Sequence, residues 1–288
     1  TTTSAAWTAL VRHRDDGIAP LGKLLADDPG RATRLGIEVG DLWIDPSRQQ
    51  VTDTTLALLA DLADERSVAA SFQRMMDGQP VNATEGIPAL HTALRAPGHE
   101  VIRVGGVDVV PAIHATLDRM SDLATSIRDG SRTGATGEPI TAVVSLGIGG
   151  SHLGPALAAE ALSHLAQADL TVRFSSNLDG ADLVEALDGL EPASTLIVVC
   201  SKSFTTVETL TAAQSARAWL AGGLGVDRAA EHVVAVTASP ERSEAFGIPA
   251  ELTFELPQWV GGRFSLPSAV GLAVMVAIGP PAFMELLA

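Results

Sequence analysis

The sequence predicts a three-layer α/β protein, in which helices cover both faces of a doubly wound, five-stranded, mainly parallel sheet. From Glu138 onward, short apolar runs alternate with stretches of helical spacing, and strands that alternate with helices form right-handed crossovers over a parallel sheet. The runs are also continuously apolar, which is typical of strands buried on both faces. The predicted strands are 141–147, 170–176, 194–200, 232–238 and 251–256.

The helices predicted between these strands complete the two outer layers. Each is a stretch with apolar residues three or four positions apart, which is the spacing of one helical face. These helices are expected over 152–167, 181–189, 205–221 and 240–246.

Two hairpin signals lie in the region before the sheet. The Pro-Ser pair within LWIDPSRQQVT (42–52) predicts a turn between two short strands, and Gly105-Gly106 predicts a turn within VIRVGGVDVV (101–110), because a glycine pair accepts positive φ.

Helical spacing over 54–76 and 112–127 fills most of the rest of that region. We therefore expect a mostly helical N-terminal region of residues 1–120, with two short hairpins, and an α/β domain of residues 121–288.

The overall charge excludes several classes of partner. The 288 residues carry a formal net charge of −15, which disfavours binding to nucleic acid or to an anionic membrane, since both need clustered Lys and Arg. The N-terminus has no signal-peptide core, and the longest apolar stretch, Ala269 to Gly279, is too short to span a bilayer. We expect a cytoplasmic protein that binds a small ligand in a formed pocket.

Two kinds of residue give little sign of a site. Cys200 is the only cysteine, which rules out an internal disulfide and is best interpreted as a buried thiol. The seven histidines show no metal-ligand spacing, so no metal is expected, and His91 is interpreted as a packed or capping residue.

The glycine turn SLGIGGSHLGP (145–155) follows a predicted strand and opens a predicted helix. The dinucleotide motif requires a third glycine where His152 stands, and no Gly-Lys-Ser/Thr follows as in a P-loop. Two interpretations remain, a tight strand-to-helix turn or an anion site at the helix N-terminus.

The segment CSKSFTTVETL (200–210) repeats this arrangement after another strand. Thr205 and Glu208 have the spacing of a capping box, which predicts that a helix starts near Thr205. The segment is interpreted either as a polar helix cap with a solvated lysine or as half of a phosphate site at the carboxyl edge of the sheet. Its candidate ligands are Ser201, Lys202, Ser203, Thr205 and Thr206.

The third loop, WVGGRFSLPSAVG (259–271), follows the last predicted strand and precedes a helix that is expected to hold Pro267 in its first turn. Arg263 lies there among glycines and apolar residues. It is interpreted either as an arginine that pins the loop by bonding backbone carbonyls, or as a fixed cation facing developing negative charge.

Together the three loops resemble the glucose-6-phosphate isomerase (phosphoglucose isomerase) family. Residues 259–271 match its glycine-glycine-arginine-aromatic-serine signature, and the likeness continues through 82–85 and 91–95 and covers essentially the whole chain. It implies a sugar-isomerase (SIS) domain and the interconversion of glucose 6-phosphate and fructose 6-phosphate through an enediolate, in glycolysis and gluconeogenesis, without a cofactor.

The resemblance also implies roles for individual residues. The sugar phosphate would be bound by Gly150 and Ser151 together with the five residues of the second loop, Arg263 would stabilise the enediolate, and Glu208 would lie beside the site, where we rank its capping role first.

The chain departs from the family pattern at three loop positions, where His152, Val207 and Pro267 replace a common Asp, Gln and Trp. The family's proton-abstracting glutamate and its ring-opening histidine would lie beyond Ala288. The chain is thus expected to be an N-terminal portion with the first of two SIS domains, inactive alone and dimeric at full length.

Two alternatives stay open at this point. A non-catalytic sensor of sugar phosphates would keep the hydroxyl-rich loop without needing Arg263. A nicotinamide dehydrogenase is disfavoured by His152 at the third glycine position.

Overall fold

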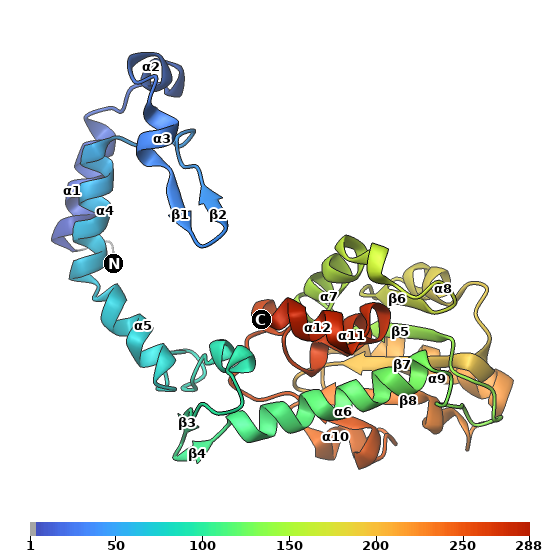
Figure 1. The fold of residues 1–288 in the computed structure, drawn as a ribbon. Coiled ribbons are helices and arrows are strands. Elements are labelled where there is room, and N and C mark those ends of the chain that lie inside the picture. Colours follow the sequence, from blue (N-terminus) through green and yellow to red (C-terminus); the bar gives the residue numbers. More distant parts are fainter. Residues whose placement is uncertain (1–3) are drawn as a thin grey trace. The chain divides into compact units, whose positions relative to one another are not determined.

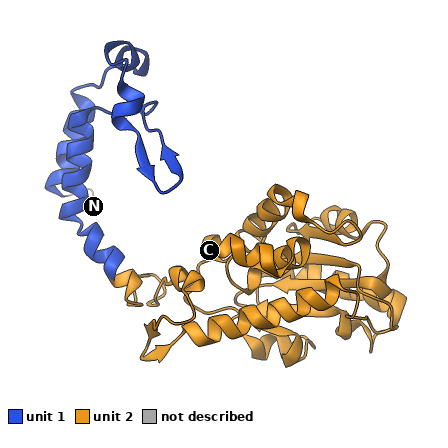
Figure 2. Ribbon diagram, in the orientation of Figure 1, with its two compact units in different colours: residues 1–73 blue, residues 74–288 orange. Residues whose placement is uncertain are grey.

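A computed structural model of the chain describes residues 4–288 (Figure 1). The chain divides into two compact units, residues 1–73 and residues 74–288, which are coloured separately in Figure 2.

The first unit consists of short helices and one hairpin. Helices α1 (Ala5–Asp15) and α4 (Asp53–Glu65) pack together, and their ends are joined by a hydrogen bond from the Ala6 amide to the Glu65 carboxylate (2.8 Å). The Thr52 hydroxyl accepts from the Thr55 amide, which caps α4. The elements are α1 (Ala5–Asp15), α2 (Leu21–Asp27), α3 (Arg31–Leu35), β1 (Ile37–Val39), β2 (Leu42–Ile44) and α4 (Asp53–Glu65), and α5 (Val68–Met76) contains the boundary between the units.

The hairpin of the first unit is not the one predicted over residues 42–52. Strand β1 pairs with β2 in antiparallel register around Gly40, so Leu42 begins the second strand of the hairpin. Residues 45–52 form no strand because the buried Arg31 guanidinium takes up the carbonyls of Ser47 (2.8 Å) and Val51 (2.7 Å), and that of Gln49 as well. The predicted helix over 54–76 is likewise interrupted, between α4 and α5.

The hairpin predicted at Gly105-Gly106 is confirmed. It pairs β3 (Arg103–Val104) with β4 (Val107–Asp108) and leads directly into α6 (Val110–Arg128), which contains the predicted helix 112–127.

The predicted three-layer fold with a five-stranded parallel sheet is confirmed. The strand order is β6-β5-β7-β8-β9, and all four neighbouring pairs are parallel. The strands lie within three residues of their predicted bounds: β5 (Ala142–Leu146), β6 (Thr171–Ser175), β7 (Thr195–Cys200), β8 (Val233–Thr237) and β9 (Thr253–Glu255). The helices among them are α7 (Gly150–Ala161), α8 (Gly180–Leu187), α9 (Val207–Leu224) and α10 (Pro240–Ala245).

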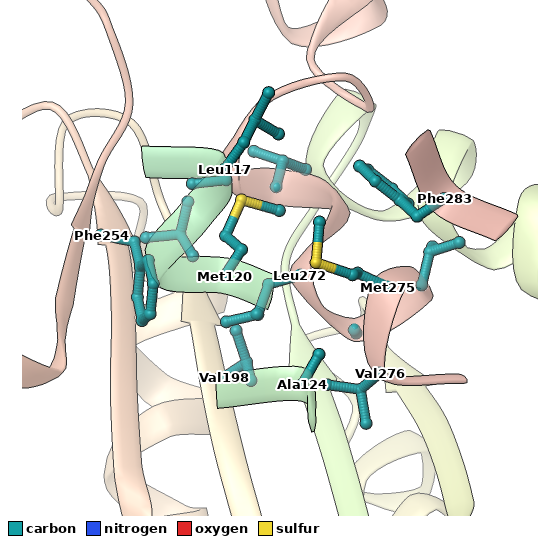
Figure 3. Packing of buried hydrophobic residues seen from close by; sticks show 14 of the residues in the cluster. Leu117, Met120, Ala124, Val198, Phe254, Leu272, Met275, Val276 and Phe283 are labelled. Carbon is teal, nitrogen blue, oxygen red and sulfur yellow. The ribbon is translucent and has the colours of Figure 1, made fainter. Parts of the chain in front are cut away.

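The core lies on both faces of this sheet. Successive residues of β7 alternate between two clusters, since Leu196 and Val198 belong to one and Ile197 and Val199 to the other. Helices α6 and α11 (Leu272–Ile278) cover the first face, where α12 (Pro280–Leu287) contributes Phe283, while α8 and α9 cover the second. Figure 3 shows side chains of α6 and α11 meeting Val198 and Phe254 of the sheet.

The expected position of Pro267 in the first turn of a helix is wrong. Pro267 lies in a turn, because α11 starts only at Leu272, and all seven residues of α11 are buried. The division of the chain into residues 1–120 and 121–288 stays a prediction, and α6 spans residue 120 with Met120 fully buried in the core. Among residues 4–288 no helix is long and apolar enough to cross a membrane.

Candidate functional site

The candidate site lies where the order of strands reverses. Strand β5 is followed in sequence by β6 on one side and, after a crossover, by β7 on its other side. Ligands of doubly wound sheets bind outside the carboxyl ends of the strands at such a switch point. The glycine turn (145–155) follows β5, and the hydroxyl-rich loop (200–210) follows β7. Because β5 and β7 are neighbours, the two loops emerge next to each other.

The glycine turn depends on two glycines for different reasons. Gly149 has φ 58° and ψ −121°, a conformation that side-chain-bearing residues avoid. Gly150 begins α7, and a Cβ atom there would overlap the carbonyl group of Gly262 and lie 2.7 Å from the Arg263 nitrogen. The absence of a side chain at Gly150 therefore lets the glycine turn and the Arg263 loop touch through their backbones.

The hydroxyl-rich loop is fastened at several points to β8 and to the helix after it. The Ser201 amide donates to the Val236 carbonyl (3.0 Å), and the Lys202 carbonyl accepts from the Ala238 amide (2.9 Å). Arg242 donates to the Ser203 carbonyl (2.7 Å). These bonds fix the backbone of the loop and leave its side chains at the carboxyl edge of the sheet.

Phe204 is the hydrophobic anchor of this loop. It has φ 52°, is buried, and lies edge-on to Phe246 with ring centroids 5.8 Å apart. The hydroxyls that flank this ring form two pairs. Ser203 and Thr205 (2.7 Å) lie at the surface, whereas Ser201, which pairs with Thr206 (3.3 Å), is buried.

The capping box predicted from Thr205 and Glu208 is wrong. Helix α9 starts at Val207 with Thr206 at its N-cap, and no side chain caps it. The Thr205 hydroxyl bonds Ser203 because the Phe204 anchor holds it outside the helix, and Glu208 lies half-buried in the first helical turn.

Neither of the two helices that begin at this edge of the sheet has a side-chain cap, since the N-cap of α7 is Gly149. In α7 the amides of Ser151 and His152 donate to the carbonyls of Ile148 (3.2 Å) and Gly149 (3.1 Å), so the Gly150 amide is its free donor within residues 4–288. The first backbone N–H groups of a helix have no partner inside the helix and carry a partial positive charge. Two such ends beside a switch point make an arrangement suited to an anion.

The Arg263 loop is held by serines and not by its arginine. Ser265 donates to the Gly262 carbonyl (2.7 Å) and more weakly to that of Gly150 (3.4 Å). The Arg263 side chain is exposed and makes no hydrogen bond or ion pair within residues 4–288, so the loop-pinning interpretation is wrong.

Lys202 and Ser151 are also without protein partners for their side chains in the described part of the chain. Both are half-buried. A lysine, an arginine and a hydroxyl that are all free to bind therefore accompany the two helix N-termini, and these are groups that coordinate phosphate.

His91 packs beside the Arg263 loop, as the packed-residue interpretation predicts. Its ring stacks on Phe264, with centroids 4.1 Å apart and planes 14° apart, and partial burial lowers its pKa. Sequence reasoning missed this stacking and the Phe204 anchor, because ring contacts between distant segments leave no local pattern.

His152 faces the other side of the glycine turn. Its ring lies edge-on to Phe174 of β6, with centroids 6.1 Å apart, while the hydroxyl-rich loop follows β7 on the far side of β5. His152 also helps to lower the pKa of the Asp182 carboxyl. The departure from the family pattern at His152 therefore affects the β6 side of the turn.

Asp182 organises the loop after β6. Burial alone would raise the pKa of its carboxyl, but hydrogen bonds from the Ser175 hydroxyl (2.6 Å) and the amides of Asn177 (3.0 Å) and Ser176 (2.7 Å) lower it overall. A carboxyl group whose pKa falls on folding stabilises the folded state above its ordinary pKa, and that stabilisation disappears as the pH falls through the lowered value.

Replacing Asp182 with Ala is expected to lower the free energy of unfolding by about 2 kcal/mol at pH 7, the cost of losing charged hydrogen bonds. The deficit should shrink below a pH of about 4 as the carboxyl is protonated in the parent protein. Urea unfolding at pH 7 and pH 3 measures both effects. Asp188→Ala is the control, because its side chain is exposed and bonds nothing in residues 4–288; a pH-independent deficit for Asp182→Ala would contradict the account.

The described residues add neither a reactive thiol nor a metal site to this arrangement. Burial raises the pKa of the Cys200 thiol to about 12, which agrees with the expected inert core thiol. Among residues 4–288, no group of three His, Cys, Asp or Glu side chains is placed to hold a metal ion.

The fold and the site together define a doubly wound α/β protein in which two helices without side-chain caps begin at the switch point. The chain belongs to the phosphoglucose isomerase family, whose model matches residues 45–288. This confirms the resemblance found in the three loops.

Individual relatives agree with this assignment. The chain is 51% identical over 284 residues to a glucose-6-phosphate isomerase of Streptomyces griseus, covering 98% of this chain and 51% of that protein. It is 49% identical to one of Mycolicibacterium smegmatis, covering 100% of this chain and 52% of that protein. A crystal structure of the Chlamydia trachomatis enzyme matches 99% of this chain and 54% of its own, with a TM-score of 0.81 and 26% identity. The chain thus spans about half the length of these relatives.

Proposed function

We propose that the carboxyl edge of this sheet binds the phosphate group of a hexose phosphate, and that the protein takes part in the cytoplasmic interconversion of glucose 6-phosphate and fructose 6-phosphate. The observation that carries the proposal is the pair of uncapped helices, α7 and α9, at the switch point. The relatives named as glucose-6-phosphate isomerases support the choice of substrate.

The phosphate is held by both loops. The Ser151 hydroxyl and the Gly150 amide bind from one side, and Lys202 with the exposed hydroxyls of Ser203 and Thr205 binds from the other. A charged hydrogen bond contributes about 1.5–3 kcal/mol, so three or four of them hold a monophosphate in spite of the net charge of −15.

Arg263 supplies a positive charge for the enediolate. Removal of the C2 proton places negative charge on the neighbouring oxygens, and a cationic donor that binds this charge lowers the barrier. Gly150 brings the Arg263 backbone against the glycine turn, so the arginine and the phosphate-binding groups share one edge.

Proton removal needs a carboxylate or another base within hydrogen-bond reach of C2. Glu208 is the single acidic residue within 147–155, 200–210 and 259–271, and it lies in the first turn of α9, where we assign it to the surroundings of the phosphate. The proton-abstracting base therefore comes from outside these loops, and the full-length enzyme acts as a homodimer.

The 288-residue chain is accordingly expected to bind fructose 6-phosphate with little or no turnover. Calorimetry measures the binding and a coupled dehydrogenase assay measures the turnover. Ser151→Ala and Lys202→Ala should each weaken binding by about tenfold to a hundredfold, because each removes a hydrogen bond to a charged group.

Turnover of the isolated chain at the rate of a complete enzyme would contradict the assignment of the base. Unchanged affinity in both variants would contradict the phosphate site. If Arg263→Ala bound both fructose 6-phosphate and an enediolate analogue as tightly as the parent protein does, the protein would instead be a sugar-phosphate sensor.

A further inference from the structure

A cavity of about 150 Å³ lies between α6 and the Arg263 loop. One wall comes from α6, through Ile113 and Leu117, and another from the Arg263 loop, through Trp259 and Pro267. All of its lining residues belong to the second unit of the chain. Strand β9 ends beside the cavity and is separated from β7 by β8, so the cavity is distinct from the phosphate site between β5 and β7.

The lining of the cavity suits a flat apolar group. Trp259 and Leu117 are buried, and the buried residues Leu94, Ile113 and Ala269 add further apolar surface. An apolar cavity of about 150 Å³ admits a benzene ring. Two aromatic rings also attract each other beyond the gain from their burial. The cavity therefore has the size and the lining for one aromatic ring beside Trp259.

Pro267 contributes to this free space. It lines the cavity at one of the loop positions where the chain departs from the family pattern, with proline in place of a common Trp. A proline ring is much smaller than an indole. A tryptophan at position 267 is therefore expected to fill the cavity and to exclude a ligand from it.

The cavity has one charged residue in its lining. The side chain of Glu255, at the end of β9, is exposed and makes no hydrogen bond or ion pair within residues 4–288. Arg119 of α6 is engaged elsewhere: its guanidinium lies 4.7 Å from the ring centroid of Phe254 and donates to the carbonyls of Glu251 and Thr253. An unpaired carboxylate beside an apolar cavity favours a cationic ligand over an anionic one.

We propose that this cavity binds a small ligand that carries one aromatic ring and a cationic amino group. The ring lies against Trp259 and the apolar side chains of α6, and the ammonium group lies at the Glu255 carboxylate. Because Trp259 and residues 267–269 belong to the Arg263 loop, the bound ligand also restrains that loop. The proposal does not rest on the proposed isomerase activity, since it uses none of the phosphate-binding groups.

The test uses 2-phenylethylamine and, as its counterpart, 3-phenylpropionate, which joins the same ring and spacer to a carboxylate. Calorimetry on the 288-residue chain should give a Kd of about 1 mM for the amine, as expected for a ligand of this size. The carboxylate probe should bind at least about threefold more weakly, and Glu255→Gln should remove this preference. Amide hydrogen exchange over residues 261–268 should slow at least about threefold in the amine complex.

Two variants test the location of the ligand. Pro267→Trp should weaken binding of the amine at least about tenfold by filling the cavity. Ala112→Phe should do the same at its rim, because Ala112 is an exposed residue of α6 that lines the cavity. The matched control is Ala115→Phe, the same change at an exposed alanine of α6 outside the lining, which should leave the affinity unchanged. Thermal unfolding verifies that each variant is folded.

Three outcomes would overturn the proposal. The first is the absence of saturable binding of 2-phenylethylamine to the parent chain, and the second is unchanged affinity in both Pro267→Trp and Ala112→Phe. The third is binding of 3-phenylpropionate as tight as that of the amine. Ser151→Ala should weaken binding of fructose 6-phosphate and leave binding of the amine unchanged, so failure of the phosphate site and failure of this cavity site are distinguishable.

Discussion

Arg263→Ala is expected to weaken binding of an enediolate analogue by about 10²-fold, the loss found when one donor to a developing oxyanion is removed. A suitable probe is a phosphorylated hydroxamate, because its hydroxamate group is planar and anionic like the enediolate group of the reaction intermediate. Binding of fructose 6-phosphate should change less than about threefold, because its phosphate is held by the other two loops. Calorimetry with both ligands on the 288-residue chain measures the difference.

The control for this prediction is Arg103→Ala. Arg103 is an exposed arginine of β3, outside the three loops, and its removal changes the net charge equally. An equal loss of affinity for both ligands in Arg263→Ala would show that the arginine merely attracts anions. An unchanged affinity for the hydroxamate would contradict its assigned role.

Gly150→Ala is expected to lower the free energy of unfolding by about 3 kcal/mol or more and to abolish phosphate binding. The added Cβ would overlap the backbone of Gly262, and backbone atoms cannot rotate out of the way as a flexible side chain can. Overpacking at such a point is among the more destabilising single changes. Urea unfolding together with phosphate titration measures both effects.

Gly222→Ala serves as the matched control. Gly222 is an exposed residue of α9 with nothing within 4 Å of a Cβ, so alanine should raise stability by about 0.5–1 kcal/mol through its better helix propensity. If Gly150→Ala behaved in the same way, the close contact between the glycine turn and the Arg263 loop would not exist in solution.

Most of the α/β unit could be predicted from the sequence because its signals are local. A parallel strand buried on both faces must be continuously apolar, so each of β5 to β9 stands out between turns. The positions of the glycine turn and the hydroxyl-rich loop follow directly, since both occur at the carboxyl ends of such strands.

The errors arose where distant residues override local patterns. The capping box predicted at Thr205 does not form, because burial of Phe204 against Phe246 keeps Thr205 outside α9. The hairpin predicted over 42–52 does not form, because the Arg31 guanidinium donates hydrogen bonds to carbonyls that a second strand would use. Neither contact leaves a spacing that a single sequence reveals.

Binding of one phosphate group between the N-termini of α7 and α9 can be tested directly by amide chemical shifts of the 288-residue chain during titration with glucose 6-phosphate. The largest changes are expected at Gly150, Ser151 and the amides of Lys202 and Val207. Changes confined to other parts of the chain, such as the β6 side of the glycine turn around His152 and Asp182, would contradict it.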